Sequence, residues 1–419
     1  MSLPLSLPTL QNWSCHSCGN CCRHHQILVS DAERQRILDQ KWTVADGVPE
    51  GNLAFAKAGG GRYRLAHRAD GACVFLDERN RCRIHAKFGE AAKPSACRIY
   101  PFAFHPTGER SMAVAIRFDC PSAAASHGAP LSEQRRELQA LRDLAVPERD
   151  DAWKAPRISA GQQLDWPDTL QIVRRFRQMI CQPDNDARLA TRLIHALFVA
   201  GMLGRATFDK VRGERLEELL DTLATCAPHE TVAASENLPP PSSLALAQFR
   251  LTVAQYAVRD TLADTGLFYR IGKALAGLRF TRGKGETPEM QPGLGRVPFS
   301  DLERPATGNA PEIDVLLERY FDVKLTGMGF CGLGCHGLNV VEGFQNLALL
   351  YPVAMYLGRW FARTRNIDAI AGSDVRNALS AIDHHHERSP LMAWGNFRNR
   401  VKWLAEKEEI GKLIGWYAR

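Results

Sequence analysis

The sequence has no hydrophobic run long enough to span a membrane and no secretory signal. Its most apolar late stretch, from Gly343 to Gly358, has sixteen residues without a charge. A membrane-spanning helix needs roughly 20 residues. At the N-terminus, Pro4 and Pro8 interrupt a stretch that lacks both a basic region and a long apolar core. We therefore expect a soluble, cytoplasmic protein without membrane contact, in which the late apolar stretch forms a buried helix.

The chain is also poor in excess charge and in aromatic residues. Lys and Arg total 53 against 46 for Asp and Glu, a net charge of +7, and aromatic residues make up 8% without following a basic stripe. Nucleic-acid binding is therefore not expected. The hydrophobic share of 45% and the charged share of 24% exclude a disordered, collagen-like or coiled-coil protein. There is no internal repeat, and a length of 419 residues indicates two or three domains.

Familiar catalytic motifs are missing as well. The sequence has no G-x-S-x-G, no P-loop and no H-E-x-x-H. Gly293 and Gly295 lie in a Pro-rich segment that does not follow a strand, which argues against a nucleotide-binding glycine loop. The histidine run Asp383–Glu387 is not interpreted as a metal site, because successive helical residues point about 100° apart. Cys181 and Cys226, each alone in a helical stretch, are interpreted as core residues.

What the sequence does contain is a cysteine cluster. Eight of the 12 cysteines fall in the first 120 residues, and the first four form the pattern C-x2-C-x2-C-C. We predict these eight as metal ligands: Cys15, Cys18, Cys21, Cys22, Cys73, Cys82, Cys97 and Cys120. Thiols stay reduced in the cytoplasm, so a cluster of them there favours metal over disulfides. Gly19 eases the turn within the run.

The choice of metal stays open between an iron–sulfur cluster and zinc. Both suit thiolate ligands. A run of cysteines followed by a distant one is common among iron–sulfur proteins, whereas structural zinc sites more often use two separate C-x2-C pairs. We favour the cluster. Adjacent side chains point in different directions, so Cys21 and Cys22 are not expected to share one ion. The plainer alternative is structural zinc or buried free thiols.

At this point the residues resemble a known family. The run Cys15–Cys22 is followed by Cys73-Val-Phe-Leu-Asp, Cys82-Arg-Ile-His and Lys93-Pro-Ser-Ala-Cys-Arg-Ile-Tyr-Pro-Phe. Together these motifs resemble the CxxCxxCC family, also called YkgJ-like, which is described as a zinc- or iron-chelating domain. The resemblance covers about residues 13–122. Lys93 stands where arginine is common and His85 where tyrosine is common, and neither change removes a cysteine.

Longer members of this family include the flagellin lysine N-methylases. They are similar to this chain in having an N-terminal cysteine cluster and a long helical remainder. That resemblance implies methyl transfer from S-adenosylmethionine to lysine side chains of a protein substrate such as flagellin. Two alternatives remain: a non-enzymatic zinc protein that is structural or binds a partner, and a protein that delivers a labile cluster.

Three further residues are candidates for binding a cofactor. Arg98 follows Cys97 and could donate a hydrogen bond to a cluster sulfide. Cys331 and Cys335 form a C-x3-C-H pattern with His336 in a glycine-rich segment. They could add ligands or act as a redox pair. The plainer reading is a tight turn with two buried thiols. Tyr100-Pro-Phe is interpreted as packing, and His24 and His25 as ordinary polar residues.

We predict a mainly α protein with a small N-terminal cysteine-rich α+β metal-binding module at residues 1–125. Helical regions follow at 126–240 and 241–419. A capping box at Ser30 and Glu33 predicts a helix start. Strands are predicted at 26–29, 62–66, 73–76 and 112–118. Helices are predicted at 131–144, 169–181, 186–203, 208–226, 244–261, 266–278, 311–320, 338–362, 374–385 and 391–405, with a linker at 227–243 and a long loop at 281–310.

Overall fold

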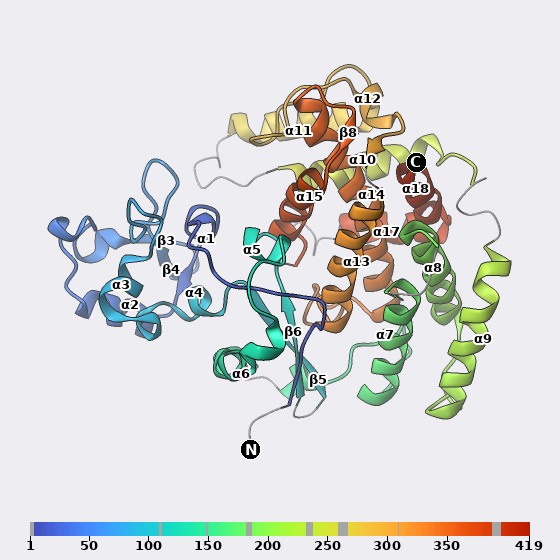
Figure 1. The fold of residues 1–419 in the computed structure, drawn as a ribbon, viewed down its shortest axis with the longest axis horizontal. Helices are drawn as coiled ribbons and strands as arrows, with labels where there is room; N and C mark the ends of the chain where they lie inside the picture. Colours follow the sequence, from blue (N-terminus) through green and yellow to red (C-terminus); the bar gives the residue numbers. More distant parts are fainter. Residues whose placement is uncertain are drawn as a thin grey trace. The chain divides into compact units, whose positions relative to one another are not determined.

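The computed structural model describes residues 4–108, 111–147, 150–181, 187–231, 238–258, 267–308, 310–387 and 395–419. The chain divides into two compact units, shown as a ribbon in Figure 1. We call Asn12–Ala103 with Cys120–Val146 the cysteine unit. We call Met1–Gln11, Phe104–Asp119 and Pro147–Arg419 the helical unit.

The cysteine unit combines short helices with a small antiparallel sheet. Its sheet has the order β2-β4-β3, with Phe55 opposite Leu65 and Leu28 opposite Arg64. Its elements are α1 (Asn20–His24), β2 (Leu28–Val29), α2 (Asp31–Asp39), η1 (Val44–Asp46), η2 (Gly51–Ala54), β3 (Phe55–Lys57), β4 (Tyr63–Leu65), α3 (Arg83–Phe88), η3 (Glu90–Ala92), α4 (Ser95–Ile99), α5 (Pro121–Ala124), η4 (Leu131–Gln134) and α6 (Arg135–Arg142).

Local sequence signals account for the start of α2 and for the core beneath it. The Ser30 side chain accepts a hydrogen bond from the Glu33 backbone, and the Glu33 carboxylate accepts one from the Ser30 backbone. This is the predicted capping box. Ile37 then packs into an apolar core with Trp42 and Phe75, and half-buried Cys22, Cys82 and Cys97 lie against this core.

The helical unit consists mostly of helices and contains the sheet β1-β6-β5, in which β1 runs parallel to β6. A second short parallel pair joins β7 to β8. Its elements are β1 (Leu5–Ser6), β5 (Phe102–Gly108), β6 (Ser111–Ile116), η5 (Asp150–Trp153), α7 (Trp166–Ile180), α8 (Leu189–Arg205), α9 (Glu214–Glu230), α10 (Ser243–Ala257), α11 (Leu267–Arg282), α12 (Phe299–Glu303), β7 (Thr307–Gly308), α13 (Ala310–Thr326), α14 (Val340–Thr364), β8 (Ala369–Ile370), α15 (Gly372–His385), α17 (Gly395–Glu406) and α18 (Glu409–Ala418).

Helix α14 is the centre of the helical unit, and α8, α15 and α18 pack around it (Figure 1). Every residue from Phe344 to Ala362 except Gln345 is buried. The Phe344 ring stacks on Phe176 of α7 with ring centroids 4.0 Å apart. The predicted buried helix is therefore confirmed. Within the described ranges, no helix combines the length and the apolar character needed to cross a bilayer.

The predicted fold class is confirmed, since a small cysteine-rich α+β region precedes a mostly helical remainder. The boundaries at 125 and 240 stay predictions. Residues 73–76 were expected to be a strand, which is wrong: Leu76 N donates to Cys73 O, so these residues form a turn between two isolated bridges. Apolar content alone does not distinguish a buried turn from a strand.

Three further expectations need correction or a limit. The loop predicted at 281–310 contains α12 and β7, and α18 was not predicted. Cys226 is exposed rather than part of the core. The buried residues of α9 are Leu216, Leu220 and Ala227, and Cys226 lies beside that stripe. Cys181 is half-buried, and its thiol lies 3.7 Å from the carbonyl oxygen of Glu318. Residues 391–394 of the last predicted helix, and parts of the predicted linker, lie outside the described residues.

Candidate metal centre

The first cysteine run folds into a tight turn and a short helix. Gly19 has a left-handed backbone (φ 70°) and precedes α1, which contains Cys21 and Cys22. A Cβ atom at Gly19 would lie 3.0 Å from the Asn80 side chain, so both the backbone angle and the space there favour glycine. The predicted role of Gly19 in easing this turn is confirmed. The turn leaves Cys15 and Cys18 exposed, with Cys21 and Cys22 half-buried.

The later cysteines reach the same region through short backbone connections. Cys73 N donates to Cys22 O at 2.8 Å, which joins the two motifs directly. Cys82 pairs with Leu76 in an isolated bridge and begins α3, and Cys97 lies within α4. Each motif therefore presents its cysteine from a turn or a short helix. The position of each thiol depends on these local structures rather than on strand pairing.

The sulfur atoms influence one another electrostatically. Cys73 and Cys82 raise the pKa of Cys22, while Cys73, Cys82 and Cys21 raise that of Cys97. Cys15 and Cys21 likewise raise the pKa of Cys18. These effects connect seven of the eight predicted ligands into one group, which we call the thiol cluster: Cys15, Cys18, Cys21, Cys22, Cys73, Cys82 and Cys97.

The eighth predicted ligand, Cys120, lies in the cysteine unit as well. It is buried and precedes α5. His16, which follows Cys15, hydrogen-bonds through Nδ1 to Ser122 Oγ near the start of the same helix. The loop that contains Cys15 is therefore fixed beside the turn that contains Cys120. Whether Cys120 is a ligand stays a prediction.

The Sγ atoms of Cys21 and Cys22 lie 3.9 Å apart. Four sulfurs bound to one zinc ion at about 2.3 Å would be separated by about 3.8 Å, so this pair is spaced as two ligands of one ion would be. Adjacency therefore does not keep these sulfurs apart, and whether they share one ion stays a prediction. Among the described residues, however, no three cysteine sulfurs lie within 4.8 Å of one another.

Ionising the thiol cluster requires a cation. Burial raises the pKa of Cys73 to about 12, and burial likewise raises the pKa of Cys97. The hydrogen bond from Cys22 lowers the pKa of Cys21 to about 7, whereas the same bond and burial raise the pKa of Cys22. A bound metal would supply the missing positive charge, since coordinated thiols lose their protons.

Two basic side chains suit such a centre. The ammonium of Lys93 lowers the pKa of both Cys21 and Cys97, and its side chain is only 16% exposed. Arg98 Nε is buried and donates to no acceptor within the part of the chain that the structure describes. A hydrogen bond to a cluster sulfide or thiolate would satisfy this donor. The donor set therefore fits a thiolate-bound metal, and Lys93 is a residue for which the sequence suggested no role.

The second cysteine pattern lies in the helical unit and folds as a tight turn. Cys331 and Cys335 are free thiols and fully buried. A Cβ atom at Gly334 would lie 2.1 Å from Met328 O, and one at Gly329 would lie 2.9 Å from Glu387 Oε1. The glycines thus allow the turn to approach its own chain closely. A ligand or redox role for the two thiols stays a prediction.

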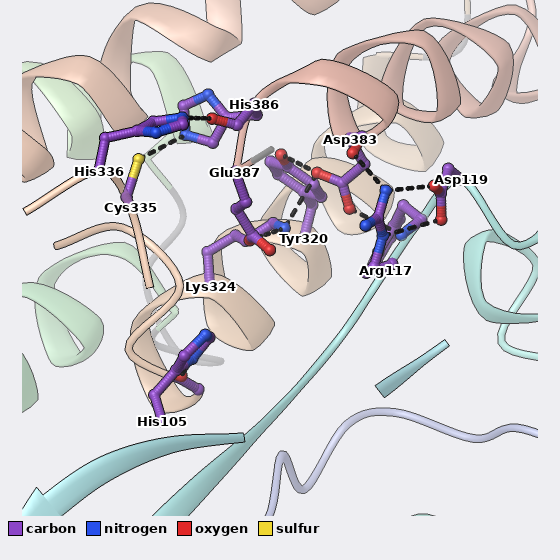
Figure 2. A network of polar contacts seen from close by, with 12 residues as sticks. His105, Arg117, Asp119, Tyr320, Lys324, Cys335, His336, Asp383, His386 and Glu387 are labelled. Atoms are coloured by element: carbon purple, nitrogen blue, oxygen red, sulfur yellow. Dashed lines mark hydrogen bonds and ion pairs between the residues drawn. The ribbon is translucent and has the colours of Figure 1, made fainter. Parts of the chain in front are cut away.

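A buried ionic network lies next to this turn (Figure 2). Lys324 of α13 contacts Asp383 Oδ1 at 3.0 Å and Glu387 Oε1 at 2.6 Å. Asp383 also accepts from Tyr320 Oη at 2.7 Å and from the Phe118 backbone at 2.7 Å. Arg117 forms an ion pair with Asp119 and donates to Asp383 O. The side chains of Lys324 and Asp383 are each 1% exposed.

Lys324 and Glu387 hold each other in their ionised forms, whereas burial raises the pKa of Asp383 despite the nearby Lys324. Burial would raise the pKa of Glu387, but Lys324 lowers it to about 2. Burial would lower the pKa of Lys324, but Asp383 and Glu387 raise it. Removing one partner from such a group leaves a buried charge without compensation. Sequence reasoning did not find this network, because Lys324 is one of several charged residues in α13 and nothing in the local sequence marks it as buried.

His386 couples the network to the glycine-rich turn. Its Nε2 lies 3.9 Å from Cys335 Sγ (Figure 2). Its Nδ1 lies 2.8 Å from Tyr256 Oη. Burial lowers the pKa of His386 to about 3, and burial raises that of Cys335 to about 12. At neutral pH the pair is therefore a neutral imidazole beside a neutral thiol, and not an activated thiolate.

The pKa of His386 predicts an acid sensitivity. The unfolded chain takes up a proton at this histidine below its ordinary pKa of 6.5, while the folded chain does not until about 3. Stability contributed by the neutral ring is therefore lost as the pH falls from 6.5 towards 3. Between pH 7 and 5 the loss is about 2 kcal/mol.

The variant H386Q should lack this loss, which urea denaturation at pH 7 and pH 5 would measure. Exposed His229 offers the matched control H229Q, which should keep the wild-type pH dependence. Equal pH dependence in all three proteins would contradict the assignment.

Comparison with known proteins returns one result. No curated protein and no solved structure matches this chain. The family model that matches is CxxCxxCC, described as "Putative zinc- or iron-chelating domain". It covers residues 14–121, which include all eight predicted ligands. By this match, residues 14–121 are similar to the CxxCxxCC family, which supports metal binding by this part of the chain.

Proposed function

We propose that the thiol cluster binds an iron–sulfur cluster. The observation that carries the proposal is that the first cysteine run packs with the distant cysteines: Cys73 N donates to Cys22 O, and Cys22, Cys73, Cys82 and Cys97 lie in or against one apolar core. A cysteine run with distant partners is more typical of iron–sulfur proteins than of structural zinc sites. When bound, a cluster would supply redox or Lewis-acid chemistry at this module.

The residues of the chain have distinct tasks in this proposal. Cys73 and Cys97 hold the buried side of the cluster, and exposed Cys15 and Cys18 hold its outer side. Lys93 offsets the negative charge of the thiolates. Arg98 donates its buried Nε–H to a sulfur. A zinc ion held by four of the thiols, without catalysis, is the alternative.

The test is the metal content of the full chain purified without oxygen. We expect iron and acid-labile sulfide in similar amounts per chain, with broad visible absorption from the thiolate-to-iron charge transfer. The variant C226S is the matched control, because Cys226 is exposed and far from the cluster in sequence, and it should keep the full metal content. Stoichiometric zinc in a colourless protein would overturn the proposal and leave the structural zinc site.

A second proposal is methyl transfer to lysine. It rests on the resemblance to longer family members and on the helical unit that accompanies the cysteine module. In that reaction the amine of a substrate lysine loses a proton and takes the methyl group of S-adenosylmethionine, which leaves S-adenosylhomocysteine. Gly293 and Gly295 lie in a turn bridged by Gln291 and Leu294 and do not follow a strand, so a different S-adenosylmethionine site is required.

This second proposal has its own assay. Metal-loaded protein is incubated with methyl-labelled S-adenosylmethionine and flagellin, or with a lysine-rich protein as a general acceptor. We expect label on lysine. An absence of label from both acceptors with a fully loaded cluster would refute methyl transfer, and the metal proposal would stand unchanged.

A further inference from the structure

We propose that a cavity in the helical unit binds an organic ammonium ion between two tryptophans and two aspartates. The cavity has a volume of about 690 Å³ and opens where η5 and the start of α7 meet the end of β5. That volume falls in the range of small-molecule sites. Its walls include Trp153, Trp166, Asp150 and Asp165. None of these residues belongs to the thiol cluster, so the inference does not depend on the proposed function.

The apolar walls are fixed in place. Trp166 Nε1 donates to Trp153 O at 2.6 Å, which holds the Trp166 ring against the η5 backbone. Leu164, Pro167 and Leu170 complete the apolar lining. Both tryptophans are half-buried. Indole faces attract cations, and tryptophan does so most strongly among the aromatic side chains.

The carboxylates give the cavity its charge preference. Asp165 uses Oδ1 to accept the Asp168 N–H at 3.1 Å. Among the described residues, its Oδ2 makes no hydrogen bond and Asp150 makes no ion pair. Among the lining residues that the structure describes, Lys154 is the one cation, so these residues together carry a net charge of −1. A ligand with one positive charge would balance it.

The start of α7 does not reverse this preference. Helix N-termini attract anions through free N–H groups. Here Pro167 has no N–H, Asp168 N is bonded to Asp165 Oδ1, and Thr169 N is bonded to Asp165 O. At three of the first four positions of α7, the N–H that would bind an anion is therefore occupied or missing.

The shape of the lining also selects the type of cation. A metal ion or a bare ammonium would leave the two indoles and the leucines without contact. An ammonium with carbon substituents covers these apolar walls and places its charge near Asp150 and Asp165. The ligand class is therefore a small alkylated ammonium compound, for which choline is the probe.

The test compares choline with its uncharged carbon analogue, 3,3-dimethylbutan-1-ol, by calorimetric titration of the full chain at low salt. The two probes have nearly the same shape, so the difference measures the charge. We expect choline to bind about fivefold tighter or more. Equal affinities would overturn the proposal, as would tighter binding of an anion of similar size such as 3,3-dimethylbutanoate.

Variants locate the site. Asparagine also caps helices, so D165N removes the charge while keeping the start of α7. It should weaken choline binding about two- to fivefold. W153L should weaken it about fivefold or more, and the backbone carbonyl that Trp166 uses is retained. The matched control D209N removes an exposed aspartate elsewhere and should bind choline as the wild type does. Unchanged binding by both D165N and W153L would overturn the assignment of the cavity.

Discussion

Replacing Lys324 by methionine is expected to lower the free energy of unfolding by about 3–5 kcal/mol. The ammonium of Lys324 lies within 3.0 Å of Asp383 Oδ1 and 2.6 Å of Glu387 Oε1, and its side chain is 1% exposed. Methionine has a similar length but no charge, so two carboxylates would be left buried without their cation. Urea denaturation followed by circular dichroism measures the loss.

The matched control is the same substitution at the surface. Lys402 lies 3.8 Å from Glu406, and both side chains are more than half exposed. K402M should therefore change stability by about 0.5 kcal/mol or less. If K324M is as mild as K402M, the network does not depend on its lysine.

Neutralising the carboxylates tests the cause of the loss. Adding D383N and E387Q to K324M removes the uncompensated charges while nearly keeping the volumes. We expect the triple variant to recover part of the lost stability, because the cost of K324M is the buried charge rather than the missing methylene contacts. A triple variant that is less stable than K324M would show that packing or hydrogen bonds dominate.

Replacing Cys22 by serine is expected to lower the bound metal to below half of the wild-type amount. Cys22 connects the first run to the later motifs, because its carbonyl oxygen accepts a hydrogen bond from Cys73 N. Its sulfur lies 3.9 Å from Cys21 Sγ. Serine preserves the backbone bond and removes the soft ligand. Metal and sulfide per chain are the readouts, with C226S as the matched control.

Loss of the metal is also expected to destabilise the cysteine unit by several kcal/mol. Metal-binding free energy becomes folding free energy when the site forms only in the folded chain. The elements around the thiol cluster are short, such as α1 and α4 with five residues each, so they have little stability of their own.

This destabilisation should appear as faster proteolysis within Asn12–Ala103. A strong iron and zinc chelator added to the wild-type protein should increase the proteolysis in the same way as the loss of metal in C22S. This second measurement applies even if C22S fails to fold. If the chelated protein loses its metal but keeps its protection, the metal has no structural role in the cysteine unit.

The sequence predicted those features that depend on neighbouring residues. Ser30 and Glu33 lie three positions apart, so their reciprocal cap was visible as a pattern. Gly19 was recognised because it lies within the cysteine run, and its left-handed backbone is confirmed. The buried helix α14 followed from its uncharged composition, and the matching family model includes every cysteine of the thiol cluster.

The same reasoning was wrong where packing decides. Residues 73–76 are as apolar as a strand, but they bury their side chains from a turn. Cys226 lies in a helix, but its position relative to the stripe formed by Leu216, Leu220 and Ala227 leaves it exposed. Composition predicts that a segment is buried or helical, and not which face of it meets the core.

Only the tertiary structure brought together the charges of the helical unit and the walls of its cavity. Lys324 and Glu387 are separated by 63 positions, and Arg117 and Asp383 by 266. No spacing rule relates residues that distant, because their contacts depend on how α13, α15 and β6 pack. The sequence alone therefore determined local features of the cysteine module, namely the capping box of α2 and the left-handed turn at Gly19, and it named the candidate ligands. Packing decided which buried ions compensate one another and which tryptophans line one cavity. The reason is that electrostatic and van der Waals contacts depend on distance in space and not on distance along the chain.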